Sequence, residues 1–189
     1  MNTETIVAMA ISLFSGIAFT QPLPQDPSCP SEDSILKKAK EPSADTKDRL
    51  RNLPCMRRID NQKAIPGLLA LTAEKDERLA SAAAEAITRS LHDHIKDSRQ
   101  PIQRLLKNQH ASVRNEALRF IGESAWDASF RSPIIEIMRG DKEEANRIAA
   151  IYALARWKQE RKEIEGASHD ESESVRGAAA FALKNFDSN

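Results

Sequence analysis

The sequence predicts an all-α protein, an α-solenoid of about four helical hairpins with an N-terminal helical cap. Three observations lead to this fold class. One apolar motif recurs four times, and a second helical pattern precedes each copy. Strand signals are scarce, because the 189 residues include one Tyr and no Val-rich alternating segment. A single hairpin cannot bury its apolar face alone, so we expect the hairpins to stack.

The recurring motif is clearest in its last copy. With Val175 as position zero, Arg176 follows at +1, Ala179 at +4 and Leu183 at +8. This spacing places the apolar residues on one face of a helix. The four zero positions, separated by 34, 33 and 29 residues, are Leu79, Val113, Asn146 and Val175. The first copy keeps the apolar frame but has Ala80 in place of the arginine.

A second helix is expected before each copy. Its anchors follow the spacing 0, +3, +4, and prolines lie at or beside the first anchor, where a first helical turn tolerates them. The anchors are Ile65, Leu68 and Leu69, then Ile102, Leu105 and Leu106, then Ile134, Ile137 and Met138. In the last copy Ile164 and Ala167 take these places, and the helix is short.

The turn between the two helices carries a polar residue at position −5. Its side-chain oxygen is expected to accept hydrogen bonds from free backbone donors at the helix start. These residues are Glu74, Asn108, Asp141 and Asp170.

The segment Ala64-Ile65-Pro66-Gly67-Leu68-Leu69-Ala70-Leu71 and the Asp-x4-Val-Arg-x2-Ala-x3-Leu pattern of residues 170–183 resemble HEAT repeats. They are most similar to the short bacterial HEAT-like repeats first associated with phycobilisome lyases. The resemblance covers about residues 60–188. It implies a solenoid but no single function, because the family includes scaffolds, lyases, hydroxylases and nucleic-acid-binding proteins.

The N-terminal residues are typical of an exported protein. Residues 6–20 form an uncharged apolar run that is short for a membrane span and fits a signal peptide over residues 1–20. Cleavage is expected after Ala18 or Thr20, although the run lacks a basic residue before it. The prediction is a secreted or periplasmic protein with no membrane association after cleavage. The alternative is an uncleaved N-terminal anchor.

A proline-rich linker over residues 21–31 is followed by predicted capping helices over residues 32–59 and by the repeats over residues 60–189. One capping helix should run from Glu32 to Lys40, and the next from Ser43 to about Leu53, where Pro54 disturbs its end. Leu50, Leu53 and Met56 are expected to cover the exposed end of the first repeat.

The two cysteines, Cys29 and Cys55, both lie in this N-terminal segment. In an exported protein an even number of cysteines predicts a disulfide, here between the linker and the capping helices. Closing this loop should contribute roughly 3–4 kcal/mol. The alternative is a pair of free buried thiols.

The arginine column Arg114, Arg147 and Arg176 permits two interpretations. It could bind an anion, or it could form a ladder with turn carboxylates such as Asp141 and Asp170 between stacked units. We favour the ladder.

Histidines invite a metal hypothesis, because HEAT-repeat deoxyhypusine hydroxylase uses paired His-Glu motifs. Here His92-Asp93 and His169-Asp170 are similar only in outline, with Asp for Glu and a position in turns. We therefore predict no metal site and no cofactor. A bilin lyase would need a cytoplasmic pocket, which export opposes, and no common nucleotide-binding or hydrolase motif is present.

The outer face of the second helices is the candidate binding surface. Position +6 holds Glu85, Arg119, Tyr152 and Phe181, and Ile148 lies nearby at +2. Aromatic anchors beside charged residues are typical of the centre of a protein interface. The alternative is packing between repeats, which we expect to bury the +5 residues Ala84, Leu118, Ile151 and Ala180. We also expect Trp126 and Trp157 to pack between repeats.

The sequence thus predicts an exported, monomeric, non-enzymatic protein that binds a protein or peptide on its concave face. Tyr152, Phe181, Ile148 and Arg119 would be anchors, with Glu85 and Arg156 at the rim. An adaptor or an inhibitor of the immunity-protein type fits this size. The alternatives are a HEAT-like metal-dependent hydroxylase using His92, His94 and His169, or a bilin lyase-type enzyme. The 28 basic and 28 acidic residues oppose a nucleic-acid-binding solenoid of the DNA glycosylase type.

Overall fold

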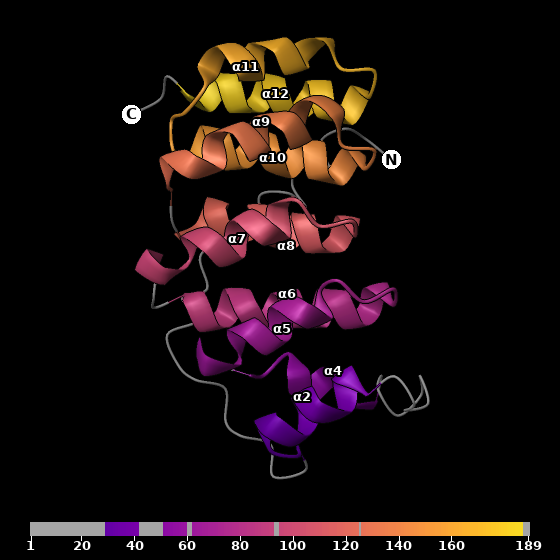
Figure 1. Ribbon diagram of the computed structural model, residues 1–189. Coiled ribbons are helices and arrows are strands. Elements are labelled where there is room, and N and C mark those ends of the chain that lie inside the picture. Colours follow the sequence, from indigo (N-terminus) through magenta and orange to yellow (C-terminus); the bar gives the residue numbers. More distant parts are fainter. Residues whose placement is uncertain (1–28, 42–50, 60–61, 93–94, 125, 187–189) are drawn as a thin grey trace.

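The computed structural model describes residues 29–41, 51–59, 62–92, 95–124 and 126–186. Every regular element in these ranges is a helix, and the helices pair into hairpins that stack from one end of the molecule to the other (Figure 1). This confirms the predicted all-α solenoid. The expected signal peptide and most of the linker lie outside the described residues.

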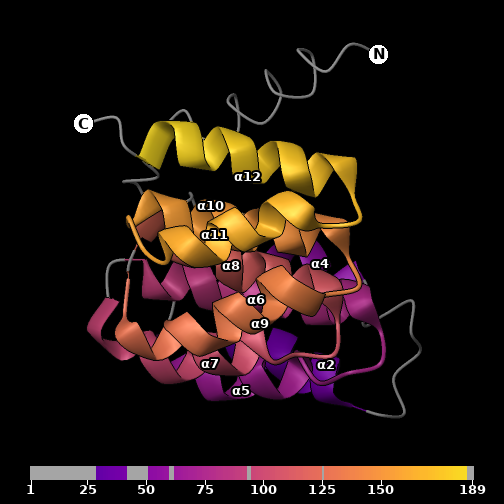
Figure 2. The same cartoon turned by 90° about the horizontal axis from the view of Figure 1, so that it is seen from above.

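Four hairpins form the array, each with a first helix, a turn and a longer second helix. Their bounds are α5 Ile65–Leu71 and α6 Glu77–Leu91, α7 Arg99–Leu106 and α8 Ala111–Ser124, α9 Arg131–Gly140 and α10 Glu144–Arg156, and α11 Arg161–Gly166 and α12 Glu173–Phe186. Short 3-10 turns accompany the first helices: η1 Gln62–Ala64, η2 Ile95–Asp97, η3 Ala128–Phe130 and η4 Ala167–His169. Figure 2 shows α5, α7 and α9 on one side of the array and α6, α8 and α10 on the other.

The predicted apolar frame forms the core. In the first three repeats every residue at zero, +4 and +8 is buried, and in the fourth only Leu183 is half-buried. The first-helix anchors are buried too, except the half-buried Leu69 and Ala167. Asn146 is buried at an apolar position, where its amide donates to Ala111 O and accepts from Asn115 Nδ2. Its polar atoms are therefore paired, as burial requires.

The turns begin the second helices as expected in three repeats. Side-chain oxygens of Asn108, Asp141 and Asp170 accept from the backbone N–H two residues later at 2.8–3.0 Å. The first repeat corrects the prediction, because Asp76, and not Glu74, accepts from the N–H of Arg78 at 3.0 Å. Asp76 directly precedes α6, so it reaches the first free donors of that helix.

The arginine ladder is confirmed at two interfaces. Arg114 donates from Nε and Nη2 to Asp141 of the next repeat at 2.6 and 2.7 Å. Arg147 holds Asp170 in the same two-bond manner at 2.9 and 2.8 Å. Such paired hydrogen bonds fix distance and orientation together, so the ladder sets how neighbouring repeats stack.

The N-terminal end of the array is covered by α2 Glu32–Lys40, which packs on α5, and by α4 Leu53–Met56, which packs on α6. Met56 is fully buried against the core, and Leu53 is half-buried. Pro54 lies in the first turn of α4 rather than at the end of a helix, a position that suits proline. Leu50 and most of the predicted helix from Ser43 lie outside the described residues.

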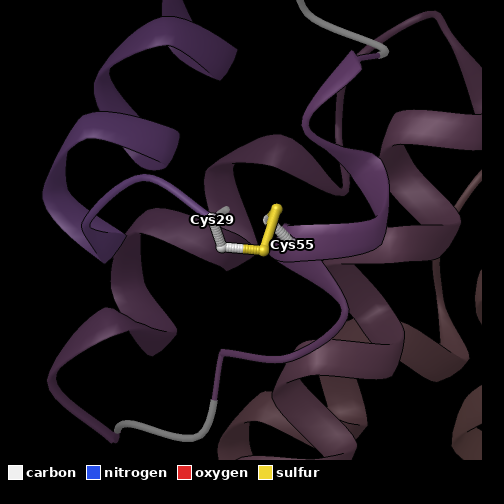
Figure 3. The surroundings of a disulfide bond; sticks show 2 residues. All are labelled: Cys29 and Cys55. Carbon is white, nitrogen blue, oxygen red and sulfur yellow. A yellow bond between two sulfur atoms is a disulfide. The ribbon is translucent and has the colours of Figure 1, made fainter. Parts of the chain in front are cut away.

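Cys29 and Cys55 form the predicted disulfide, with their Cα atoms 5.6 Å apart (Figure 3). It joins the segment before α2 to α4, so the two cap helices are covalently linked. In the described ranges no helix has the length and apolar character needed to cross a membrane.

Candidate peptide-binding surface

The second helices present one residue per repeat along the array at position +6. Positions zero, +4 and +8 point into the core, so helical geometry turns +6 away from it. In the structure Phe181 is exposed, Glu85 and Tyr152 are half-buried, and the Arg119 side chain is 51% exposed. Glu85, Arg119, Tyr152 and Phe181 thus form a row across α6, α8, α10 and α12. We call this the +6 row.

The N-terminal half of the row is a charged network. The Glu85 carboxylate pairs with Arg57, which follows α4, at 2.9 Å. Arg119 donates to Glu116 and to Glu123, three residues before and four residues after it on α8. Glu85 and Arg119 are therefore both held in place by ion pairs within the chain, so their charges have fixed positions on the surface.

Burial and pairing set the protonation of this network. Burial raises the pKa of Glu85 above its usual value, and the Arg57 charge opposes that rise. Burial alone would lower the pKa of Arg119, but hydrogen bonds and charge from Glu116 and Glu123 raise it overall. Arg119 therefore stays charged, and the Glu85 carboxylate takes up a proton at a higher pH than an ordinary glutamate does.

Glu116 anchors the network in the core. Its carboxylate is buried, accepts from Arg119 and also accepts from the Thr88 hydroxyl of the preceding repeat at 2.5 Å. This contact links α6 to α8 beneath the row. Arg57, Thr88 and Glu116 were not predicted as part of this surface, because Arg57 belongs to the cap and the other two lie at repeat positions +9 and +3, away from the +6 column. The sequence did contain one indication of the role of Glu116. Position +3 is alanine in the other three repeats (Ala82, Ala149, Ala178), and only the second repeat has a charged residue there.

The C-terminal half of the row is aromatic. The rings of Tyr152 and Phe181 meet edge to face, with centroids 6.4 Å apart and an interplanar angle of 85°. Ile148 is half-buried one turn before Tyr152 on α10. Phe181 is 37% exposed, the one large hydrophobic side chain in the exposed class among the described residues. Burial raises the pKa of Tyr152, so its phenol is neutral at physiological pH.

Arg156 lies at the end of α10 and is exposed, as a rim residue should be. Its guanidinium carbon lies 5.8 Å from the ring centroid of Trp157. Trp157 is half-buried and donates from Nε1 to Ile121 O of the preceding repeat at 2.7 Å. This contact fits the expected packing of Trp157 between repeats.

Three of the four +5 residues, Ala84, Leu118 and Ile151, are buried between repeats as expected. Ala180 is the exception and corrects the prediction, since it is exposed. No described helix packs on the outer side of α12, so the packing that buries the other three is absent there.

None of the described histidines belongs to the +6 row. His92 follows α6, His169 ends η4, and both are exposed, while His94 lies outside the described residues. His110 joins two repeats, with Nε2 2.7 Å from Glu74 O. The described residues contain no group of three or more His, Cys, Asp or Glu placed to hold a metal ion.

A shallow hollow lies on a different part of the molecule. It is lined by residues of the α7–α8 turn and of α9, including Leu106, Pro133 and Ile137, and none of its lining residues belongs to the +6 row. This hollow therefore contributes nothing to the +6 row.

Comparisons with known proteins support the fold class. No protein-family model matches the chain, and no curated protein matches it. Among solved structures, a designed armadillo repeat protein in complex with the peptide (KR)4 is 17% identical with a TM-score of 0.54, over 81% of this chain and 80% of that one. An engineered protein is also 17% identical, with a TM-score of 0.55 over 83% and 81%. At this identity the likeness shows an armadillo-like helical repeat solenoid and nothing about function.

Proposed function

We propose that this protein is a non-enzymatic, HEAT-like repeat protein that binds an extended peptide or a segment of another protein across the +6 row. The observation that carries the proposal is the aromatic pair Tyr152–Phe181, with Phe181 exposed beside an ordered charged network. An apolar anchor in a polar rim is the arrangement that gives protein interfaces most of their binding energy.

The two halves of the row have different roles in this proposal. Tyr152, Phe181 and Ile148 receive an apolar side chain of the ligand. Arg119, with Glu85 at the rim, orients the ligand through charge. Arg156 lies at the other rim and faces solvent. A solved neighbour of the same fold is in complex with the peptide (KR)4, which is consistent with peptide binding by such a solenoid.

The compartment belongs to the same proposal. A disulfide between Cys29 and Cys55 favours an oxidising environment, and residues 6–20 have the composition of a signal peptide. We propose a secreted or periplasmic adaptor or inhibitor. Intact-mass measurement of the native protein tests this. Loss of the first 18 to 20 residues, with both cysteines alkylated only after reduction, supports export, and a full-length chain with free thiols contradicts it.

The binding test is selection from a random peptide library displayed on phage, with the intact protein as bait. Enriched peptides should carry an aromatic or large aliphatic residue. Phe181→Ala should weaken them by about tenfold or more, the scale of an interface anchor. The control is Ile135→Ala, a half-buried apolar residue on the first helix α9. Peptides that bind Phe181→Ala as well as the unsubstituted protein would place the binding surface elsewhere.

A further inference from the structure

Two contacts join α10 to the turn that begins the next second helix. Arg147 holds the Asp170 carboxylate through Nε and Nη2. Glu144, three residues earlier on α10, accepts from the Ser172 hydroxyl at 2.6 Å. A Glu-x-x-Arg pair on one helix therefore receives an Asp-x-Ser turn from the next repeat.

Each contact also occurs singly at an earlier interface. Glu77 on α6 accepts from the Ser112 hydroxyl at 2.9 Å, and Arg114 on α8 holds Asp141. The first interface lacks both partners of the ion pair. On α6, Ala80 takes the place of the arginine. In the next turn, Asn108 takes the place of the aspartate, and its amide donates to Thr72 O. An arginine at +1 of one repeat is thus paired with an aspartate in the turn of the next repeat, and the repeat without this arginine is followed by an asparagine.

The last helix carries the full pair again, as Glu173 and Arg176. Both side chains are exposed, and no described residue pairs with the Glu173 carboxylate or with Nε and Nη2 of Arg176. By contrast, the equivalent Arg147 side chain is 8% exposed beneath its partner. The pair that receives a turn within the array is therefore present at the outer edge of α12, where no described residue occupies it.

Arg176 is already held in the receiving orientation. Its Nη1 donates to Asp170 O at 2.8 Å and to Glu171 O at 2.9 Å. Arg114 makes the same two bonds, from Nη1 to Asn108 O and Gln109 O, while its Nε and Nη2 bind the carboxylate. Because the backbone carbonyls already orient the guanidinium, the Arg176 side chain loses less conformational entropy when a carboxylate binds it.

The surface beside this pair allows close approach of a helix. Gly177 has open space around its Cα, and Ala180 is exposed. The equivalents of Ala180 in the second and third repeats, Leu118 and Ile151, are buried beneath the next repeat. We call Glu173, Arg176, Gly177 and Ala180 the α12 edge.

We propose that the α12 edge docks the start of a helix in a partner protein, through an Asp-x-Ser turn like the one within the array. The partner's Asp would bind Nε and Nη2 of Arg176, and its Ser hydroxyl would donate to Glu173. This surface adjoins the +6 row on α12 but shares no residue with it, and the inference does not depend on the peptide-binding proposal.

A second copy of this chain fits the edge less well. Among the described residues its two Asp-x-Ser turns are already engaged, Asp170 with Arg147 and Asp127 with Arg99. The opposite end of a second copy is covered by α2 and α4. We therefore expect the partner to be a different protein, one with an unpaired aspartate and a serine in the turn that begins a helix.

The test uses a labelled hairpin peptide with the sequence of residues 157–186, which carries this turn, and the full chain as receptor. Binding is measured by fluorescence anisotropy. Arg176→Ala in the receptor, or Asp170→Asn in the peptide, should each weaken binding by about tenfold, as loss of a charge-assisted pair does. Arg104→Ala, an exposed arginine on α7, is the control and should change nothing. Equal affinities for all variants would overturn the proposal.

A free hairpin must fold when it binds, which lowers its affinity. A second experiment therefore uses a fusion protein in which the same hairpin sequence follows Asn185. This point matches Arg156, since Asn185 lies ten residues after Val175 and Arg156 ten after Asn146. Hydrogen exchange should show the added helices protected, and Arg176→Ala should remove that protection. An unprotected hairpin on the unsubstituted chain overturns the proposal. Concentration-dependent dimers of the native protein that Arg176→Ala abolishes would overturn the choice of a different partner.

Discussion

The two ends of this solenoid are built differently. At the N-terminal end, α2 and α4 cover the first repeat, Met56 is fully buried, and a disulfide links the covering segments. At the C-terminal end, α12 leaves Arg176 and Ala180 exposed, although their equivalents inside the array are covered. Stacked repeats expose apolar and paired groups wherever an end is left uncovered. One end is therefore closed by packing and a covalent bond, and the other keeps receiving groups accessible.

The interfaces show the same contrast. The first interface has Ala80 and Asn108 and, among the described residues, no arginine–carboxylate pair, whereas the third has the buried pair Arg147–Asp170. The first interface combines apolar packing with hydrogen bonds such as Thr88–Glu116 and Ser112–Glu77, and the later interfaces add the arginine–carboxylate ladder to their apolar packing. This difference can be tested by weakening one end at a time.

The largest effect is expected from Asp170→Ala. It removes the main carboxylate partner of the Arg147 guanidinium, which is 8% exposed and keeps only a 3.8 Å contact to the exposed Glu171, so the free energy of unfolding should fall by about 3–5 kcal/mol. Urea denaturation measures the change. The double variant Arg147→Ala with Asp170→Ala should lose less than the sum of the single variants, because they share one interaction. Simple additivity would show that the pair is not coupled.

Removing the disulfide should have the next largest effect, at the other end. Cys29→Ser with Cys55→Ser opens a loop of sequence separation 26, which should lower the free energy of unfolding by roughly 3–4 kcal/mol. Hydrogen exchange should increase first in α2, α4 and α5 and leave the α10–α12 interface unchanged. An increase spread evenly over all four repeats would contradict the separation of the two ends.

Acid should weaken the contact between α10 and the turn that contains Asp170. Hydrogen bonds from Arg147 lower the pKa of Asp170, so its stabilising contribution is complete above the unfolded value near 3.9 and is lost as pH falls through the lower folded value. The loss should be smaller than in Asp170→Ala, because the protonated carboxyl keeps its shape. Denaturation below about pH 4 measures it. In Asp170→Asn this part of the pH dependence should disappear.

The smallest effect is expected from Arg176→Ala. Its side chain is exposed and bonds only carbonyl oxygens of its own turn among the described residues, so stability should change by less than about 0.5 kcal/mol. Thermal denaturation against Arg104→Ala checks this. A loss as large as that of Asp170→Ala would mean that Arg176 is structural and would remove the contrast between paired and unpaired arginines.

Particular residues show how far sequence reasoning reached. The ladder pairs Arg114–Asp141 and Arg147–Asp170 followed from the repeat register, and so did burial of the apolar frame. The disulfide followed from cysteine count and position. The prediction of Glu74 as the hydrogen-bond acceptor in the first turn was wrong, because Asp76 lies closer to the first free backbone donors of α6. Exposure of Ala180 was also missed, because burial at +5 requires a following repeat.

The sequence by itself determined the helical class, the repeat register and the residues that line each helix face, because these depend on local spacing along one chain. Tertiary structure alone decided which of those residues meet across repeats. It brought Arg57 of the cap to Glu85, Thr88 to the buried Glu116, and the Tyr152 ring to Phe181. It also distinguished two pairs of the same sequence pattern, because a described repeat packs against Glu144 and Arg147 on α10 and none packs against Glu173 and Arg176 on α12.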